Sequence, residues 1–318
     1  MKYTSNFKTK SETIQKESIR PDKAYPIALD IGYSGVKGMS PCKVFCFPSF
    51  VRQYTGKMIG EPKDTDIYYK DDTGVYAVGS LALDGLSAND TNDSTNTLFG
   101  RNRYFSTSFR IMARIGMALG MSAPSEKGWD GNAPIVLQTG LPPAYRKTDT
   151  PLLVEALSGQ HCFAMKIGGQ DWRYYNFTLP SKNIFVTDQP IGSVYSASKR
   201  NDGSTVIGED GKPYIDSRVL VLDGGFGTFD VFSIVNRSIT SFESFNALGM
   251  KAVFEKTANT ILKQFGTEIH VHTLQNALDS GKVSSFDRRT RTSRENSFDE
   301  ILFESTRPVC MNAMKTVE

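Results

Sequence analysis

Two segments far apart in the chain each place an aspartate at the end of an apolar run and follow it with glycines. They are residues 29–37 (LDIGYSGVK) and residues 222–230 (LDGGFGTFD). Successive glycines let backbone N–H groups converge on the oxygens of a phosphate group, an approach that side chains would obstruct. Each segment therefore predicts a turn that can bind phosphate.

The side chains of the first segment add further donors. Gly32, Ser34 and Gly35 permit the close approach, and the Ser34 hydroxyl can itself donate. Lys37 comes seven residues after Asp30, so in a regular hairpin its ammonium group turns back toward the phosphates as a point charge. In the second segment the permissive residues are Gly224, Gly225 and Gly227.

Asp30 and Asp223 close the two apolar runs. A carboxylate cannot face a phosphate group directly, because like charges repel. It can do so through hydrated Mg²⁺, which keeps several waters and takes one or two carboxylates. We therefore assign both aspartates to the water shell of a magnesium ion beside the phosphates.

Neither segment matches the other common phosphate-binding motifs. A GxxxxGK[ST] loop is not present in either, and neither is a GxGxxG turn that opens a helix, so P-loop and dinucleotide sites are not supported. One such turn alone could be an ordinary tight hairpin. The recurrence of strand, aspartate and turn favours phosphate binding, and it implies an α/β protein with two similar domains and a cleft between them.

The elements that must position these turns follow from the hydrophobic pattern. Apolar runs at 27–31 and 218–222 predict buried strands that end at the two aspartates. Helical spacing of apolar residues predicts a helix over 108–119, and Pro190 suits the first turn of a helix over 189–199. The other predictions are strands at 44–47, 76–78, 134–139, 184–187, 229–235 and 239–244, helices at 248–265 and 298–317, and loops at 84–99, 121–133 and 284–296.

Composition and charge narrow the class of protein. The chain has 318 residues, 39% hydrophobic and 22% charged, with a formal net charge of +3, the balance of a soluble globular protein. That charge is too small to require a nucleic acid or a membrane as partner, and no apolar run approaches the roughly 18 residues of a membrane-spanning helix. The four cysteines fit a reducing cytoplasm, and the first 24 residues read as a polar, mobile tail without a secretory signal.

The two segments resemble the phosphate-1 and phosphate-2 motifs of the superfamily that contains actin, DnaK-type chaperones and sugar kinases. Residues 188–195 (DQPIGSVY) resemble that superfamily's connecting helix, which begins with a glutamine or glutamate that orients the attacking water; Gln189 occupies this place, and Tyr195 matches a tyrosine usual six residues later. Within the superfamily, LQTGLP at 137–142 and FNALGM at 245–250 are similar to the bacterial ParM/StbA group of plasmid-partitioning proteins.

This resemblance implies a two-lobed fold of duplicated ribonuclease-H-like domains with a nucleotide cleft, lobe I at 25–190 and lobe II at 191–318. It implies slow, assembly-coupled hydrolysis of ATP or GTP with Mg²⁺, in which Gln189, Asp223 and Asp30 are the catalytic residues. It also implies a filament of identical protomers that segregates plasmid DNA through an adaptor in the bacterial cytoplasm, without direct nucleic-acid or membrane contact. The residues it assigns to the nucleotide are Gly32, Tyr33, Ser34, Gly35, Lys37, Gly224, Gly225, Phe226, Gly227, Thr228 and Gly249.

The chain departs from the family pattern at two places. Phe226 stands where actin has a second aspartate, which shifts the positioning of metal and water toward Asp223, Asp30 and Gln189. The chain also ends at Glu318, where the family's adenosine motif and closing helix are expected to follow.

Two alternatives remain open within the superfamily: a sugar or carboxylic-acid kinase, for which no distinct catalytic base is evident, and a non-catalytic scaffold. A DnaK-type chaperone is excluded, because 318 residues cannot hold its peptide-binding domain. Arg288, Arg289, Arg291 and Arg294 lie in the charged loop, and a solvated surface is preferred there to a DNA-binding or protomer-binding one.

Overall fold

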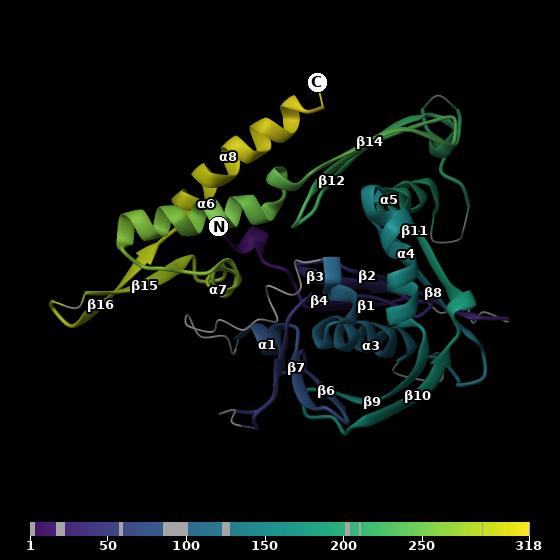
Figure 1. Ribbon diagram of the computed structural model, residues 1–318, viewed down its shortest axis with the longest axis horizontal. Helices are drawn as coiled ribbons and strands as arrows, with labels where there is room; N and C mark the ends of the chain where they lie inside the picture. The colour runs from purple at the N-terminus through teal and green to yellow at the C-terminus, as the bar shows by residue number, and fades with distance from the viewer. Residues whose placement is uncertain are drawn as a thin grey trace. The chain divides into compact units, whose positions relative to one another are not determined.

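The structure is a computed structural model, and it describes residues 4–16, 23–56, 60–84, 101–122, 128–200, 204–209, 211–287 and 289–317 (Figure 1). The chain divides into two compact units. The N-terminal unit comprises Thr9–Gly85 and Thr91–Gly192, and the C-terminal unit comprises Met1–Lys8, Leu86–Asp90 and Ser193–Glu318. The polar loop expected at 84–99 lies almost wholly outside the described residues.

A six-stranded sheet in the order β1-β4-β3-β2-β8-β11 forms the centre of the N-terminal unit. β2 and β11 pair in parallel with β8, and the other pairs are antiparallel. The strands are β1 (Glu12–Gln15), β2 (Tyr25–Ile31), β3 (Gly35–Met39), β4 (Lys43–Pro48), β8 (Ile135–Leu141) and β11 (Ile184–Asp188).

Helix α3 (Thr107–Met121) packs on β2, the strand that ends near Asp30. Two glycines make this close approach possible. A Cβ at Gly116 would lie 2.5 Å from Cδ1 of Leu29, and a Cβ at Gly120 would lie 3.0 Å from Cγ2 of Ile27. The helix and the strand thus bury each other's apolar residues in the main core of the unit.

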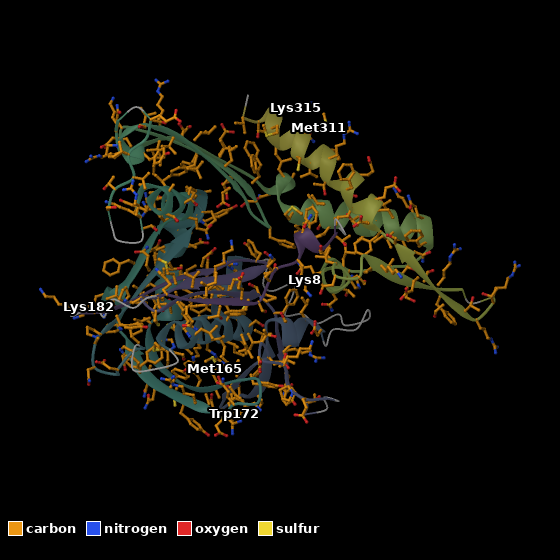
Figure 2. All side chains as sticks on the ribbon, turned by 180° about the vertical axis from the view of Figure 1, so that it is seen from behind. Lys8, Met165, Trp172, Lys182, Met311 and Lys315 are labelled. Atoms are coloured by element: carbon orange, nitrogen blue, oxygen red, sulfur yellow. The ribbon has the colours of Figure 1, made fainter. Side chains whose placement is uncertain are left out.

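A second, antiparallel sheet in the order β10-β9-β6-β7-β5 completes the N-terminal unit, with Trp172 in the turn between β9 and β10 (Figure 2). Its strands are β5 (Val51–Gln53), β6 (Ile67–Asp71), β7 (Gly74–Val78), β9 (Gly159–Ile167) and β10 (Arg173–Leu179). The remaining elements of the unit are α1 (Ser80–Asp84), η2 (Arg101–Phe105), α4 (Pro143–Leu157), η3 (Ser181–Asn183) and the start of α5 (Gln189–Ser198).

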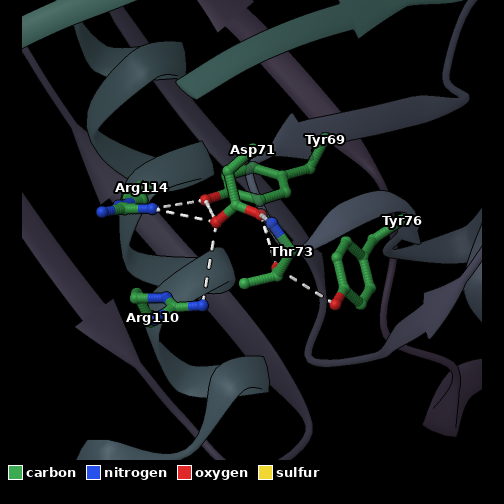
Figure 3. A network of polar contacts seen from close by, with 6 residues as sticks. All are labelled: Tyr69, Asp71, Thr73, Tyr76, Arg110 and Arg114. Carbon is green, nitrogen blue, oxygen red and sulfur yellow. Dashed lines mark hydrogen bonds and ion pairs between the residues drawn. The ribbon is translucent and has the colours of Figure 1, made fainter. Parts of the chain in front are cut away.

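Asp71, at the end of β6, ties this second sheet to α3 through a buried polar network (Figure 3). Arg114 Nη1 lies 3.2 Å and Arg110 Nη2 3.7 Å from its Oδ2, and the Tyr69 hydroxyl donates to the same oxygen at 2.7 Å. The Asp71 side chain is only 1% exposed. A buried carboxylate of this kind requires such partners, because removing a charge from water is costly.

The C-terminal unit repeats the strand–turn–strand pattern in a three-stranded antiparallel sheet, β12 (Arg218–Gly224), β13 (Phe229–Val235) and β14 (Ser238–Phe245). α6 (Met250–Phe265) and α8 (Asp299–Lys315) pack together, and their buried faces form a separate core with Phe298 and Leu302. The other elements are η1 (Thr4–Phe7), η4 (Tyr214–Asp216), η5 (Asn246–Leu248), α7 (Val271–Asn276), β15 (Lys282–Asp287) and β16 (Thr292–Ser297).

Three expectations from the sequence are wrong. The strand at 218–222 was expected to be buried, but in β12 Leu220 and Leu222 are 53% and 44% exposed. The other two concern polar segments. The polar N-terminal segment is not wholly a mobile tail: β1 pairs with β4, and the backbone N–H of Thr4 donates to Asp299 Oδ1 at 2.8 Å. The expected charged loop at 284–296 is largely the β15–β16 hairpin. Both segments are polar, so cross-strand backbone hydrogen bonds rather than a regular spacing of apolar residues determine their structure.

Within the described part of the chain, no helix is long and apolar enough to cross a membrane.

Candidate functional site

The first glycine-containing turn joins β2 to β3 and is held from one side by Ser49. The Gly32 N–H donates to the Gly35 carbonyl at 3.1 Å and closes the turn. Ser49, which is fully buried, donates its hydroxyl to the Gly32 carbonyl at 2.7 Å and its N–H to the Ser34 carbonyl at 3.0 Å. Because two turn carbonyls are directed at Ser49, this residue, which the sequence did not single out, fixes the turn's conformation.

Three residues predicted from the sequence come together beside this turn. Lys37 lies directly opposite Asp30 in the β2–β3 pair. Gln189 Nε2, at the start of α5, donates to Asp30 Oδ1 at 3.2 Å. Burial raises the pKa of Asp30, and the charges of Lys37 and Arg103 together with the Gln189 hydrogen bond oppose that rise. The arrangement can hold a polar ligand between a cation, a carboxylate and an amide.

Neighbouring residues set the position of Gln189. Arg146 of α4 pairs through Nε with Oδ1 of Asp188 at 2.8 Å, which ties the end of β11 to α4. Gly140 of β8 leaves room for the glutamine, because a Cβ there would lie 2.8 Å from Gln189 Cγ. The LQTGLP segment thus has a steric reason for its glycine.

The second turn belongs to the C-terminal unit and is fastened to the first turn of α6. The N–H groups of Met250 and Lys251 donate to the carbonyls of Gly225 and Phe226 at 3.1 and 2.8 Å. Gly249 is pressed against the turn, since a Cβ there would lie 2.6 Å from the Gly227 carbonyl carbon and 2.7 Å from the Phe226 carbonyl oxygen. These contacts assign Gly249 to support of the turn backbone.

We expect Gly249→Ala to destabilise the protein by about 1–3 kcal/mol, because the added methyl group meets backbone atoms that cannot rotate away. Gly224→Ala is the matched control in the same turn, since a Cβ there meets nothing within 4 Å. Urea unfolding of the two variants measures the difference. Equal midpoints for Gly249→Ala and the wild type would contradict the packing described above.

Phe226, predicted to contact the nucleotide, turns its side chain into the core of its own unit. Its ring centroid lies 5.9 Å from that of Phe254 in α6, and it packs against the apolar cluster of α6 and α8. Only its backbone is left for a contact with phosphate. The aromatic residue in place of an acidic one therefore has a structural reason.

Asp230 is a candidate that the sequence analysis did not assign. It lies directly opposite Asp223 in the β12–β13 pair and opposite Ser244 in the β13–β14 pair. Asp230 is 5% exposed, and its Oδ2 accepts from the Thr228 hydroxyl at 2.8 Å. Its Oδ1 and the Ser244 hydroxyl are buried without a hydrogen-bond partner among the described residues. The sequence spacing could have indicated Asp230, because it follows Asp223 by the same seven positions that separate Lys37 from Asp30.

This pair of carboxylates fits a hydrated divalent cation. Mg²⁺ is bound through one or two carboxylates and keeps several waters, and an orphaned buried carboxylate oxygen is a group that a cation or its water would satisfy. Across the residues that the structure describes, no group of three His, Cys, Asp or Glu side chains could hold a metal. The unsatisfied Asp230 oxygen suits a water-bridged ion, and this metal site stays a prediction.

The sequence model described as the N-terminal domain of actin-like proteins matches residues 28–192. The chain therefore belongs to the actin-like protein family, and its mixed α/β architecture is that of the ParM-like members. A search among curated protein sequences gives no match.

Several solved structures share this fold at low sequence identity. A ParM filament from Clostridium botulinum is 17% identical, with a TM-score of 0.68 over 92% of this chain and 83% of that chain. A non-polymerisable pCBH ParM mutant is 20% identical, with a TM-score of 0.65 over the same shares of the two chains. An archaeal actin homolog, Ta0583, is 18% identical, with a TM-score of 0.55 over 92% and 81%.

Proposed function

We propose that this chain binds a nucleoside triphosphate, ATP or GTP, with Mg²⁺, hydrolyses it slowly, and polymerises into filaments. The observation that carries the proposal is the hydrogen bond of Gln189 to Asp30, with Lys37 opposite the same carboxylate on the β2–β3 hairpin. A tight hairpin without a functional site has no need of a half-buried carboxylate that is held between an amide and a cation. The proposed lobes are residues 25–190 and 191–318.

In the proposed reaction, each turn, at 32–35 in the N-terminal unit and at 224–228 in the C-terminal unit, offers its backbone N–H groups to phosphate oxygens. Lys37 contributes a positive charge, and Mg²⁺, when bound, would neutralise phosphate charge beside Asp223 and Asp230. Gln189 uses its amide to orient a water for attack on the terminal phosphate, while Asp30 holds that amide in place. Because a glutamine is a weak base, hydrolysis is slow until assembly aligns the water.

Self-association is the proposed output of the nucleotide cycle. The structural relatives include a ParM filament and a ParM mutant described as non-polymerisable, which supports assembly as the property to test. The wider proposal is that filaments segregate plasmid DNA through a separate adaptor in the bacterial cytoplasm, without direct contact to nucleic acid.

The test is phosphate release with Mg-ATP and Mg-GTP, read together with light scattering. The wild-type chain is expected to scatter more light after nucleotide addition and then to release phosphate. Asp223→Ala is expected to lose both, because it removes a proposed ligand of the metal's water shell. Asp216→Ala is the control, since it removes a carboxylate of the same unit whose ion pair with Arg237 is exposed.

The other outcomes separate the remaining candidates. Phosphate release without scattering would contradict the filament proposal and favour a kinase of the same superfamily. Scattering that requires no nucleotide, with no phosphate release, would favour a non-catalytic scaffold. The packing of Phe226 into the core is the observation that favours the scaffold, because it removes an acidic side chain from the second turn.

A further inference from the structure

Arg103 lies beside the first turn, although nothing in the sequence pattern marks it. Its guanidinium carbon is 4.4 Å from the ring centroid of Tyr33, the residue that follows Gly32 in the turn. The same guanidinium is 5.7 Å from the ring centroids of Tyr104 and Phe109. Three aromatic rings of the N-terminal unit thus surround a half-buried cation close to the proposed phosphate site.

The backbone around Arg103 is held on both sides. Ser106 is the N-cap of α3, and its hydroxyl oxygen accepts a hydrogen bond from the Phe109 N–H at 3.1 Å. The N–H and the hydroxyl of Ser106 in turn donate to the Arg103 carbonyl at 3.0 and 2.7 Å. On the other side, the buried Tyr104 hydroxyl donates to Asp149 Oδ2 of α4 at 3.0 Å. A side chain carried by such a fixed segment loses little conformational freedom when it binds a ligand.

The chemistry of Arg103 suits a phosphate group. A guanidinium that stacks on an aromatic face keeps its N–H edge directed away from the ring, and that edge matches two phosphate oxygens. Among the described residues, no carboxylate forms an ion pair with Arg103 at salt-bridge distance. Its charge nevertheless acts on the site, because it opposes the burial that raises the pKa of Asp30.

We propose that Arg103 binds the terminal phosphate of the nucleoside triphosphate at the first turn, held in position by the Tyr33 ring. This inference rests on the proposed function. Because Asp30 orients Gln189, the proposed position of the reacting phosphate is next to these two side chains. Lys37 is one cation beside Asp30, and the Arg103 guanidinium, which stacks on Tyr33 of the same turn, is the second. Arg103 is accordingly a specificity-determining residue that distinguishes a triphosphate from a diphosphate.

The test is calorimetric titration of the full chain with a non-hydrolysable ATP analogue and with ADP, both in Mg²⁺. Arg103→Gln keeps the side-chain stem on Tyr33 and removes the charge. It is expected to weaken binding of the analogue about 10- to 100-fold, the range for a lost hydrogen bond to a charged group, and binding of ADP less than threefold. Arg103→Lys keeps a charge but not the planar fork, so it is expected to recover part of the affinity for the analogue.

Arg173→Ala is the matched control, because Arg173 also stacks on a tyrosine of the same unit, 5.4 Å from the Tyr175 ring centroid, and is expected to leave both affinities unchanged. Equal losses for analogue and ADP in Arg103→Gln would overturn the assignment to the terminal phosphate. Unchanged affinity for the analogue would overturn the inference while the proposed function stands. A wild-type chain that binds neither nucleotide would overturn both.

Discussion

Gln189→Ala is expected to lower the rate of phosphate release about 100-fold, while nucleotide affinity stays within about twofold of the wild type. The glutamine amide is the group proposed to orient the attacking water, an interaction made mainly in the transition state. Its hydrogen bond to Asp30 at 3.2 Å holds it in the site before any ligand arrives. Single-turnover phosphate release and a separate equilibrium titration measure the two quantities independently.

A second variant moves the same side chain without altering it. Gly140→Ala places a methyl group 2.8 Å from Gln189 Cγ, so the glutamine must shift. It is expected to slow hydrolysis in the same direction as Gln189→Ala but by less, again with little change in affinity. Gly169→Ala is its control, because a Cβ at Gly169 meets nothing within 4 Å. If Gln189→Ala released phosphate at the wild-type rate, the water-orienting role would be excluded.

Asp71→Ala is expected to lower the free energy of unfolding by about 3–5 kcal/mol, the largest stability effect predicted for this chain. The substitution leaves Arg114, whose side chain is 13% exposed, with a buried charge and no carboxylate at the end of β6. It also removes the acceptor of the Tyr69 hydroxyl (Figure 3). Urea denaturation followed by circular dichroism measures the change.

The control for this prediction is Asp84→Ala in the same unit. Asp84 pairs with Lys63 at 3.1 Å, but the side chains are 49% and 70% exposed, so the loss is expected to be at most about 1 kcal/mol. If the two substitutions had equal effects, the buried network would have no special part in stability.

The stability difference between wild type and Asp71→Ala is also expected to depend on pH. Burial disfavours the charged form of Asp71, but hydrogen bonds from Thr73 and Tyr69 and the charge of Arg110 outweigh it and hold the pKa below its ordinary value of 3.8. A carboxyl group with a lowered pKa stabilises the fold fully above its ordinary pKa and loses that contribution on further acidification. The difference should therefore be constant between pH 5 and 7 and shrink below pH 3.8.

Much of the candidate site around the first turn, between β2 and β3, could be predicted from local sequence. An apolar run that ends in an aspartate determines where β2 stops, glycines determine where the chain can turn, and a spacing of seven residues places Lys37 opposite Asp30. Gln189 was found by resemblance; the structure places its amide against Asp30, and its catalytic role stays a prediction. Ser49 and Arg103 could not be found in this way, because their contacts with the turn join residues that are distant in sequence.

At the second glycine-containing turn, the sequence pattern and the structure differ. From the LDGGFGTFD segment the sequence assigns Asp223 and residues 224–228 to the ligand. Only the fold shows that the Phe226 ring packs on Phe254 and that Asp230 is buried opposite Asp223. Whether a side chain faces a ligand or a core depends on the element that covers it. Here that element is α6, whose first turn binds the carbonyls of Gly225 and Phe226.

Helix α4 is the clearest case of an element whose helical structure depends on tertiary contacts. Its sequence, PAYRKTDTPLLVEAL, has an internal proline and weak apolar periodicity, so no helix was predicted there. Its structure depends on contacts with distant residues, such as Arg146 with Asp188 and Asp149 with Tyr104. The sequence by itself therefore determined the two glycine-containing turns and the strands that flank them, because these follow from backbone sterics and apolar spacing within a few residues. The tertiary structure alone decided which side chains face the site, because burial and ion pairing depend on neighbours that are far away along the chain.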